Sequence, residues 1–522
     1  MNMKFSMLVP VVVALAMSAS AKTIYISPTG SGSKDGTSAE NAATLTLLRS
    51  NFNSWFVTGE KNVVQLLDSD TPYDCPATSD TAVFDFNNGN TKYVVFQGNV
   101  DDPSKVTINL APFTKGGRVY VVRAPGELRG ITFKDYKQAD GAYPGVVCAF
   151  VAFASGKFVV EDCCFENCKT SSTNANGEES SGAVVRHYNQ DKAASTSELI
   201  MSNCVFKSCS SYQKGIIFKK YAGGKMELSG CTFEDCSTAT GTGALVYWNA
   251  AGSDTCGLTM KDCVARNLTC TGTLNTDTCG GAICLNKGNL TLEGCNFDSV
   301  SGAYNGGCVF VYNGAANLSI DRCIFRNCTC VNAAGAIFTK QTSGTLTVRN
   351  TLFTGCGVKT KNSGGSCIRT AGTTTVAIDN CTFADNCASD GTASSNVSPL
   401  DANSANAKNY VTNCIFWNNK DGGGNLRVTS NTGNTIFANC VSDLSGQGDT
   451  VVLLTSAPFV GGGDYSLSSS ATDCIDSGAA LAWMTGAKDL AGNDRVINGL
   501  PDLGAYEFGA APSVPGIMII IE

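Results

Sequence analysis

A short pattern of residues recurs about ten times along the 522-residue chain and constrains its fold more than any other feature. Three of its copies read LTLEGCNF, LSIDRCIF and VAIDNCTF. The cysteine position is occupied in turn by Cys163, Cys204, Cys231, Cys263, Cys295, Cys323, Thr351, Cys381, Cys414 and Cys440, with intervals of 26 to 41 residues. A pattern that returns at such intervals is typical of a solenoid, in which each repeat packs on its neighbours.

The spacing inside the pattern predicts three strands in each repeat. Apolar residues stand five and three positions before the cysteine, as Leu290 and Leu292 do before Cys295, which indicates a strand with one buried face. The residue directly before the cysteine position is Asn, Asp or Gly in every copy except the one with Arg322, so we expect a left-handed bend there. A phenylalanine two positions after the cysteine marks a second strand, and a glycine-led segment such as GGAIC marks a third.

Three strands per repeat predict an all-β, three-sided parallel β-helix that spans residues 61–456. The alternative repeat fold is a propeller, whose blades need four strands in about 40 to 50 residues. Several intervals of this chain are only 26 to 28 residues long. These are too short for a blade, so the coil is favoured.

Both ends of the chain differ from the repeats. Residues 1–21 combine Lys4, an apolar run over 5–17 and Ala19-Ser20-Ala21, a pattern typical of a secretory signal peptide cleaved before Lys22. The run is too short to cross a bilayer of about 30 Å, so we expect no transmembrane segment in the mature chain. Residues 22–60 are predicted to form a strand and a short helical cap, residues 457–508 closing turns, and residues 509–522 a short tail.

The terminal segments carry a family resemblance. TIYISPTGSGSKDGTS at 23–38, APFVGGGDYSLSSSATDCIDSGA at 457–479 and DLAGNDRVINGLPDLGAYEF at 489–508 resemble the ends of secreted bacterial β-helix proteins of the pectin-lyase-like superfamily. The repeats are also similar to those of polymorphic outer membrane proteins, whose F-x-x-N motif is matched at 383–386 and 416–419. Only fourteen residues follow Phe508, however, so their C-terminal barrel is not expected. The resemblance implies a single right-handed coil and a secreted or cell-surface location rather than a chemistry.

The 26 cysteines of a chain predicted to be exported suggest disulfides. We name as candidates the residues five positions after the first cysteine, which are Cys168, Cys209, Cys236, Cys328 and Cys356. Stacked strands lie about 4.8 Å apart, within the disulfide range, but parallel Cβ directions would strain such bonds, so buried stacked thiols are the alternative. With one histidine in the chain and no paired C-x-x-C motifs, neither a metal nor a cofactor is predicted.

One group of basic and aromatic residues could form a site. Aligning the glycine-led strands places Arg186 and His187 beside Lys219 and Tyr221, the four candidates for catalysis. Neutralising a uronate carboxylate and removing its neighbouring proton would need side chains of these types. The candidates for glycan binding are Lys220, Tyr247, Trp248 and Tyr312. The alternative is that these residues form an ordinary row of solvent-exposed side chains without a ligand.

These observations lead to two hypotheses about function. The first is a secreted or cell-surface, non-enzymatic monomer with an adhesive, structural or glycan-binding role, whose partner is a polysaccharide or a host or cell-surface component. The second is a polysaccharide lyase or glycoside hydrolase that acts on an acidic polysaccharide. The net charge of −7 argues against a nucleic-acid partner.

Overall fold

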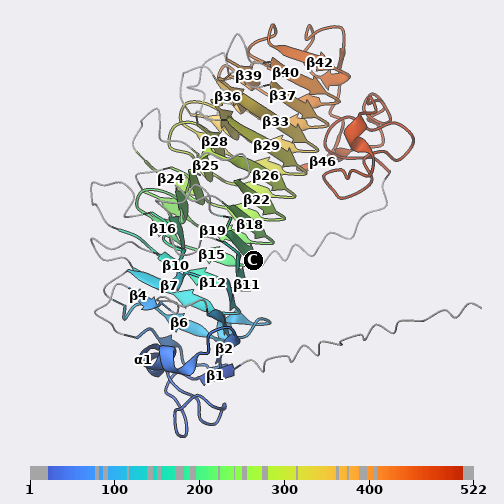
Figure 1. The fold of residues 1–522 in the computed structure, drawn as a ribbon. Helices are drawn as coiled ribbons and strands as arrows, with labels where there is room; N and C mark the ends of the chain where they lie inside the picture. The colour runs from blue at the N-terminus through green and yellow to red at the C-terminus, as the bar shows by residue number, and fades with distance from the viewer. Residues whose placement is uncertain are drawn as a thin grey trace, which may run out of the picture.

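A long coil of parallel strands forms the body of the molecule (Figure 1). The computed structural model describes residues 22–76, 82–85, 92–113, 117–137, 145–149, 155–171, 181–188, 196–220, 224–239, 242–249, 256–272, 280–312, 315–341, 343–359, 364–372, 375–386, 397–403 and 408–509. Successive strands of each long sheet come from successive turns of the chain and pair in parallel. The three-sided coil predicted from the repeats is confirmed, and each turn is called a rung below.

Three long sheets make the walls. Sheet A has 14 strands: β1 (Lys22–Ile26), β2 (Lys61–Leu66), β5 (Tyr93–Gln97), β8 (Gly126–Arg129), β11 (Lys157–Glu161), β14 (Glu198–Ser202), β18 (Lys225–Ser229), β22 (Gly257–Lys261), β26 (Asn289–Glu293), β29 (Ala315–Asp321), β33 (Ser343–Arg349), β37 (Thr375–Asp379), β40 (Lys408–Thr412) and β42 (Thr435–Ala438).

Sheet B also has 14 strands: β3 (Tyr73–Asp74), β6 (Thr107–Asn109), β9 (Thr132–Lys134), β12 (Cys164–Glu166), β15 (Val205–Lys207), β19 (Thr232–Glu234), β23 (Val264–Arg266), β27 (Asn296–Asp298), β30 (Ile324–Arg326), β34 (Leu352–Thr354), β38 (Thr382–Ala384), β41 (Ile415–Trp417), β43 (Cys440–Ser442) and β44 (Val451–Leu453).

Sheet C has 11 strands: β4 (Ala82–Phe84), β7 (Arg118–Val122), β10 (Gly145–Ala149), β13 (Val185–Tyr188), β17 (Ile217–Lys220), β21 (Val246–Asn249), β25 (Ile283–Lys287), β28 (Val309–Val311), β32 (Ile337–Thr339), β36 (Gly365–Thr370) and β39 (Ser398–Ala402). Short strands join some corners between sheets B and C: β16 (Ser210–Ser211), β20 (Ser237–Thr238), β24 (Thr269–Cys270), β31 (Thr329–Cys330) and β35 (Gly357–Val358).

The corner between sheets A and B is a single left-handed residue in the repeats. Asn203, Asn350 and Asn380 have φ between 47° and 52° at this place, as the sequence predicts. Arg322 also adopts φ 51°, although its side chain is not of the preferred type, and its Nη2 donates to Glu293 Oε1 at 2.6 Å. The chain therefore turns at the same point in every repeat and keeps the strands in register.

The phenylalanines of sheet B stack inside the coil. Rings of neighbouring rungs lie nearly parallel, for example Phe206 on Phe233 with centroids 4.5 Å apart and Phe383 on Phe416 at 4.9 Å. Ala265 occupies the same position between Phe233 and Phe297 and interrupts the stack. The described cysteines of the first column are buried beside these rings, as the spacing predicts.

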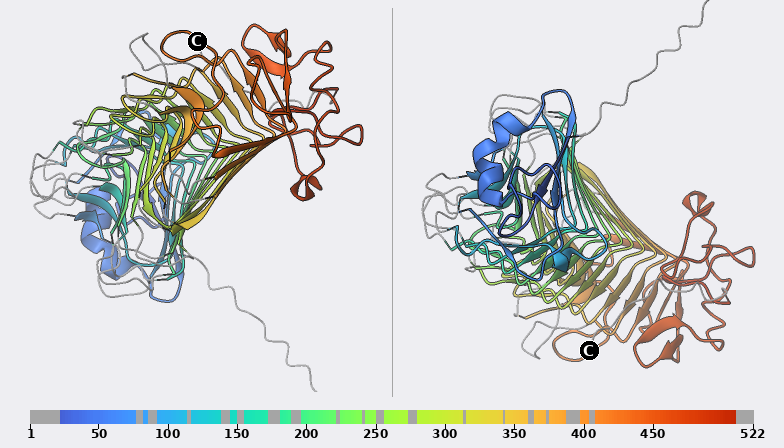
Figure 2. Two further views of the ribbon diagram at one scale, coloured as in Figure 1. Left: turned by 90° about the horizontal axis from the view of Figure 1, so that it is seen from above. Right: turned by 90° about the horizontal axis from the view of Figure 1, so that it is seen from below.

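The two ends of the coil are treated differently. Helix α1 (Leu45–Trp55) lies across the N-terminal end and buries Leu45, Leu48 and Phe52, with Thr44 as its N-cap. The C-terminal segment 457–509, which we call the closing segment, contains β45 (Phe459–Gly461), β46 (Asp464–Leu467) and the 3-10 helix η2 (Ala482–Met484). Figure 2 shows it beside the last rungs instead of across their end. The sequence predicts a closure at this end but not its lateral position.

Side-chain hydrogen bonds hold the closing segment on the corner between sheets A and B. Tyr465 Oη is 2.8 Å from Thr354 Oγ1, and the Ala505 amide donates to Thr382 Oγ1 at 3.0 Å. Asn380 Nδ2 donates to the Asp502 carbonyl at 2.9 Å. The closing segment therefore covers part of the outer face of sheet B on the last rungs.

Candidate functional site

The candidate residues of sheet C pair one position away from the register that the sequence suggests. Arg186 lies opposite Phe218, and His187 lies opposite Lys219. Lys219 in turn lies opposite Trp248, while Phe218 lies opposite Tyr247. The expected row of Arg186 with Lys219 is therefore wrong by one residue, and the two side chains lie on opposite faces of the sheet.

His187, Lys219 and Trp248 face the interior of the coil and are fully buried. Lys219 Nζ donates to the Gly224 carbonyl at 3.1 Å and lies 4.3 Å from the centre of the Trp248 ring. Burial lowers the pKa of Lys219 to about 7. Burial, and then the nearby Lys219 charge, lowers the pKa of His187 well below its usual value. These residues form an interior polar contact and not the exposed basic row that was expected.

The remaining candidates are on the outer face of sheet C or outside the description. Arg186 is fully buried and its guanidinium lies 5.0 Å from the Phe218 ring centre. Tyr247 stacks on Phe218 with centroids 5.6 Å apart, and Tyr312 packs near Phe310. Tyr221 lies outside the described residues, and so does the side chain of Lys220. The structure thus brings Arg186, Phe218 and Tyr247 together, in a largely buried row.

The five disulfide candidates Cys168, Cys209, Cys236, Cys328 and Cys356 are buried free thiols in the structure. Each donates to a carbonyl of its own rung and of the preceding one, as Cys209 Sγ does to Lys207 at 3.4 Å and Phe165 at 3.2 Å. The structure therefore describes their reduced state, and their pairing stays a prediction. Within the described residues, no group of three or more His, Cys, Asp or Glu side chains is placed to hold a metal ion.

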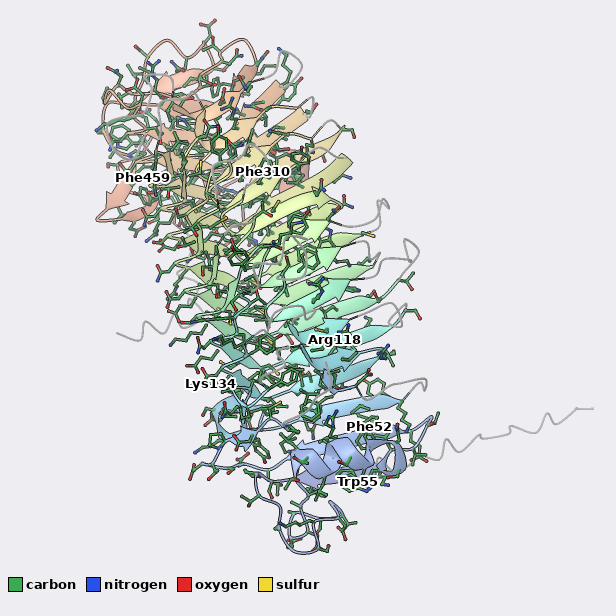
Figure 3. All side chains as sticks on the ribbon, turned by 90° about the vertical axis from the view of Figure 1, so that its left-hand side faces the viewer. Phe52, Trp55, Arg118, Lys134, Phe310 and Phe459 are labelled. Carbon is green, nitrogen blue, oxygen red and sulfur yellow. The ribbon has the colours of Figure 1, made fainter. Side chains whose placement is uncertain are left out.

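A groove of about 820 Å³ opens on the outer face of sheet B, near its N-terminal end. It extends over the strands β6, β9, β12 and β15, and a volume of this size suits a ligand site. It is lined by Pro72, Val100, Asp102, Pro103, Ser104, Thr107, Asn109, Thr132, Lys134, Asp135, Asp162, Cys163, Cys164, Glu166, Asn203 and Val205. In Figure 3, Lys134 marks this side of the coil and Phe459 marks the closing segment farther along it.

An insertion builds one wall of the groove. Between β5 and β6 the chain runs through residues 98–106 instead of a one-residue corner, and it includes the 3-10 helix η1 (Pro103–Lys105). Asp102 caps this helix by accepting from Ser104 N at 3.1 Å. Thr132 Oγ1 donates to the Pro103 carbonyl at 3.0 Å and fixes the wall to sheet B. The sequence contains one sign of this insertion: the Asn-Cys type of corner that separates the first two strands of a repeat is absent between YVVFQ and TIN.

Charged side chains form the floor of the groove. Lys134 Nζ lies 3.2 Å from Glu166 Oε1, and both side chains are more than one third exposed. Asp102 has a pKa held below its usual value, first by the Ser104 hydroxyl. Cys164 is half-buried, and burial raises the pKa of its thiol to about 11. The floor can therefore donate and accept hydrogen bonds, but its thiol is not activated as a nucleophile.

The charge pattern of the groove continues along the outer face of sheet B. In register from rung to rung stand Lys134, Glu166, Lys207, Glu234, Arg266, Asp298 and Arg326, which we call the charged row. The sign alternates at every step, and strands in a sheet lie about 4.8 Å apart. The next residue in register is Thr354, which the closing segment covers.

Comparison with known proteins supports the fold. Residues 280–461 match the family model described as the right handed beta helix region, and the coil is a right-handed parallel β-helix. A search of curated proteins finds no match. Among the described residues, no helix is long and apolar enough to cross a membrane.

Two solved structures are similar over nearly their whole length. One is pectate lyase Pel9A, with a TM-score of 0.38 and 13% identity over 93% of this chain and 96% of that chain. The other is a rhamnogalacturonan lyase, with a TM-score of 0.29 and 12% identity over 94% of this chain and 97% of that chain. At such scores the similarity carries no argument about activity.

Proposed function

We propose that this protein is a non-enzymatic glycan-binding β-helix whose binding surface is the groove on the outer face of sheet B. The observation that carries the proposal is the groove of about 820 Å³, which lies on rigid strands and is walled by the insertion 98–106. Its floor offers Lys134, Glu166 and Asp135 beside the apolar Val205. Hydroxyl-rich ligands need such mixed donors and acceptors on a pre-formed surface.

The ligand in this proposal is a segment of a linear polysaccharide that lies along the coil. The groove is open, and the charged row extends from it toward β30, so a longer chain could continue past the groove. Lys134 would contact an acidic sugar, and Glu166 would accept hydrogen bonds from hydroxyls. We expect this surface to serve as an adhesive or cell-surface contact in a monomer.

Isothermal titration calorimetry against uronate polymers and neutral linear polysaccharides tests the proposal. We expect binding by the wild type, at least a tenfold weaker Kd for Lys134→Ala, and a similar loss for Val205→Arg, which fills the groove. Lys225→Ala is the matched control, because it removes an exposed lysine from β18 in sheet A and should leave Kd unchanged. If no polymer binds, or if neither groove variant weakens binding while circular dichroism shows them folded, the proposal fails.

The alternative is a polysaccharide lyase or hydrolase on acidic polysaccharide. A lyase needs an exposed base beside its substrate, whereas His187 and Lys219 are enclosed by the coil. Incubation with uronate polymers separates the two functions, because a lyase forms an unsaturated product seen by ultraviolet absorbance and a hydrolase forms new reducing ends seen by a reducing-sugar assay. Absorbance that rises with wild type and is abolished in Lys134→Ala would establish the alternative.

We also propose that the chain is exported to the cell surface or the medium. The support is the leader-like pattern of residues 1–21, which lie outside the described residues. N-terminal sequencing of the mature protein should begin at Lys22. A mature protein that retains Met1 would contradict export by cleavage.

A further inference from the structure

Four buried cysteines from two walls of the coil meet at one corner. Cys328 and Cys356 follow the sheet B strands β30 and β34, whereas Cys308 and Cys367 belong to the sheet C side, before β28 and within β36. All four are fully buried in the main core. The thiols of Cys308 and Cys328, of Cys328 and Cys356, and of Cys356 and Cys367 are neighbours within this corner.

The backbone explains why the two walls approach so closely here. A Cβ on Gly307, directly before Cys308, would lie 2.6 Å from the Thr329 carbonyl oxygen, directly after Cys328. A Cβ on Gly335 would lie 2.5 Å from both the Cys328 and the Ser366 carbonyl oxygens. Glycine is therefore required at these positions, and its use brings the residues beside Cys308 and Cys367 against those beside Cys328 and Cys356.

The other rungs of this cysteine column lack the cross-wall arrangement. In sheet C, the position of Cys308 and Cys367 directly precedes the paired residues Val309 and Ile368. In the rungs of Cys168, Cys209 and Cys236 this position holds Val184, Ile216 and Leu245 instead of a cysteine. Those three cysteines therefore have thiol neighbours only above and below among the described residues.

Stacked thiols also contact one another, as Cys204 and Cys231 do, so contact alone does not select a pair. Stacked cysteines occupy the same place in successive rungs, and their Cβ directions are parallel, which opposes the dihedral angle that a disulfide needs. Cys308 and Cys367 come from the sheet C side of the corner and Cys328 and Cys356 from the sheet B side, so no shared column holds their Cβ directions parallel. Geometry therefore favours pairs across the corner over pairs along a column.

We propose that Cys308 pairs with Cys328 and Cys356 pairs with Cys367 as two disulfides that tie sheet B to sheet C. In each pair the two thiols lose two protons and two electrons as the S–S bond forms. A disulfide donor, such as glutathione disulfide or a protein oxidase, accepts them and is reduced to two thiols. Because the four residues are fully buried, the pairs form during folding, before the rungs close over them.

Disulfide mapping of the full chain tests the pairing. The chain is unfolded with reductant, refolded in a glutathione redox couple, alkylated in denaturant and digested without reduction. We expect peptides that link Cys308 with Cys328 and Cys356 with Cys367, and alkylation of four fewer than the 26 cysteines. A link between Cys328 and Cys356, a link within the column of Cys168, Cys209 and Cys236, or alkylation of all the cysteines would overturn the proposal.

Two matched variants sharpen the test. Cys328→Ala should expose Cys308 to alkylation and leave the link between Cys356 and Cys367 intact. Cys236→Ala removes a cysteine of the same column and should change no link. Protection of Cys308 in Cys328→Ala, or loss of a link in Cys236→Ala, would contradict the pairing. Metal analysis of the refolded protein completes the design, because a stoichiometric metal that protects all four thiols would also overturn it.

Discussion

The outer face of sheet B is open over its N-terminal strands and is covered by the closing segment over β34, β38, β41 and β43; we call these two regions the open half and the closing half. Val205 on β15 is 36% exposed, while Ile415, which stands in the same row on β41, is fully buried under the closing segment. The backbone of the two regions is the same, with the phenylalanine stack beneath both. The difference therefore comes from what lies on the face and not from the coil itself.

The residues of the charged row change at the boundary between the two regions. The row runs through Arg266 and Asp298 to Arg326, then continues as Thr354, Ala384 and Trp417. Ionised side chains are costly to bury, so uncharged residues replace them where the closing segment packs. The open half keeps its charges and its groove, whereas the closing half has uncharged residues that pack under the closing segment.

The largest expected effect follows from breaking the closing segment's buried ion pair. Arg495 and Glu507 pair with both side chains at most 2% exposed. Arg495→Ala leaves a buried carboxyl without its partner, which should cost about 3–5 kcal/mol of unfolding free energy. Limited proteolysis should then release the closing segment while the open half stays resistant.

Lys488→Ala is the control for this experiment. Its ion pair with Asp494 is 2.7 Å long, but the two side chains are 48% and 72% exposed. Exposed ion pairs contribute little to stability, so Lys488→Ala should lower the unfolding free energy by less than about 1 kcal/mol. Equal proteolysis of the two variants would show that the buried pair does not hold the closing segment.

Two alanine substitutions at positions in register on sheet B measure how much the packing of the closing segment contributes to stability. Ile415→Ala should destabilise the protein by about 2–5 kcal/mol, because it opens a cavity beneath the closing segment. Val205→Ala, in register on the open half, should change stability by less than about 0.5 kcal/mol. Urea unfolding gives both values, and similar losses would remove the distinction between the halves.

The two halves should respond to pH in opposite directions. Burial raises the pKa of Glu507 from 4.5 to about 7, and it also raises the pKa of Asp502 and of Asp379. The folded closing half therefore binds protons that the unfolded chain has lost, and its stability should fall as the pH rises from about 4.5 to about 7. Near the N-terminus, hydrogen bonds lower the pKa of Asp35 and Asp102. The stability that these two carboxylates contribute is therefore lost only as the pH falls below the usual pKa range of aspartate.

Hydrogen exchange corrected for intrinsic rates reports this contrast region by region. Protection of the closing segment should be greater at pH 5 than at pH 7.5, and Glu507→Gln should reduce that difference. Stronger protection of the closing segment at pH 7.5 would show that its carboxyl groups are charged in the folded state.

The smallest effects concern single polar residues in the same row. Thr354→Ala removes the hydrogen bond with Tyr465 and should cost about 1 kcal/mol. Arg266→Ala on the open half should change stability by less than about 0.5 kcal/mol. A larger loss for Arg266→Ala in thermal unfolding would mean that the charged row stabilises the coil.

The repeats allowed the coil to be predicted, because each buried position recurs at the same place in every rung. Even Arg322 adopts the left-handed corner that its column predicts. The register of sheet C was missed because the strands were aligned by their leading glycines, whereas the pairing places Gly215 one position out of line with Gly182. Aligning the apolar Val185, Ile217 and Val246 instead would have placed His187 and Lys219 inside the coil.

The groove and the position of the closing segment could not be predicted in the same way. The groove wall depends on an insertion between β5 and β6 where no repeat pattern exists. The closing segment is held by contacts between residues far apart in the chain, such as Tyr465 with Thr354 and Arg495 with Asn350. A local periodicity contains no information about such contacts.

The alternation along the charged row gives the open face a periodic electrostatic potential. Like charges recur at every second rung, a spacing of about 9.6 Å along the axis of the coil. A linear polyelectrolyte that lies parallel to the axis would match this potential only if its own charges repeat at the same distance. A ligand with another repeat would meet attraction and repulsion in turn, so under the proposed function the fixed distance between strands would favour ligands by the spacing of their charges.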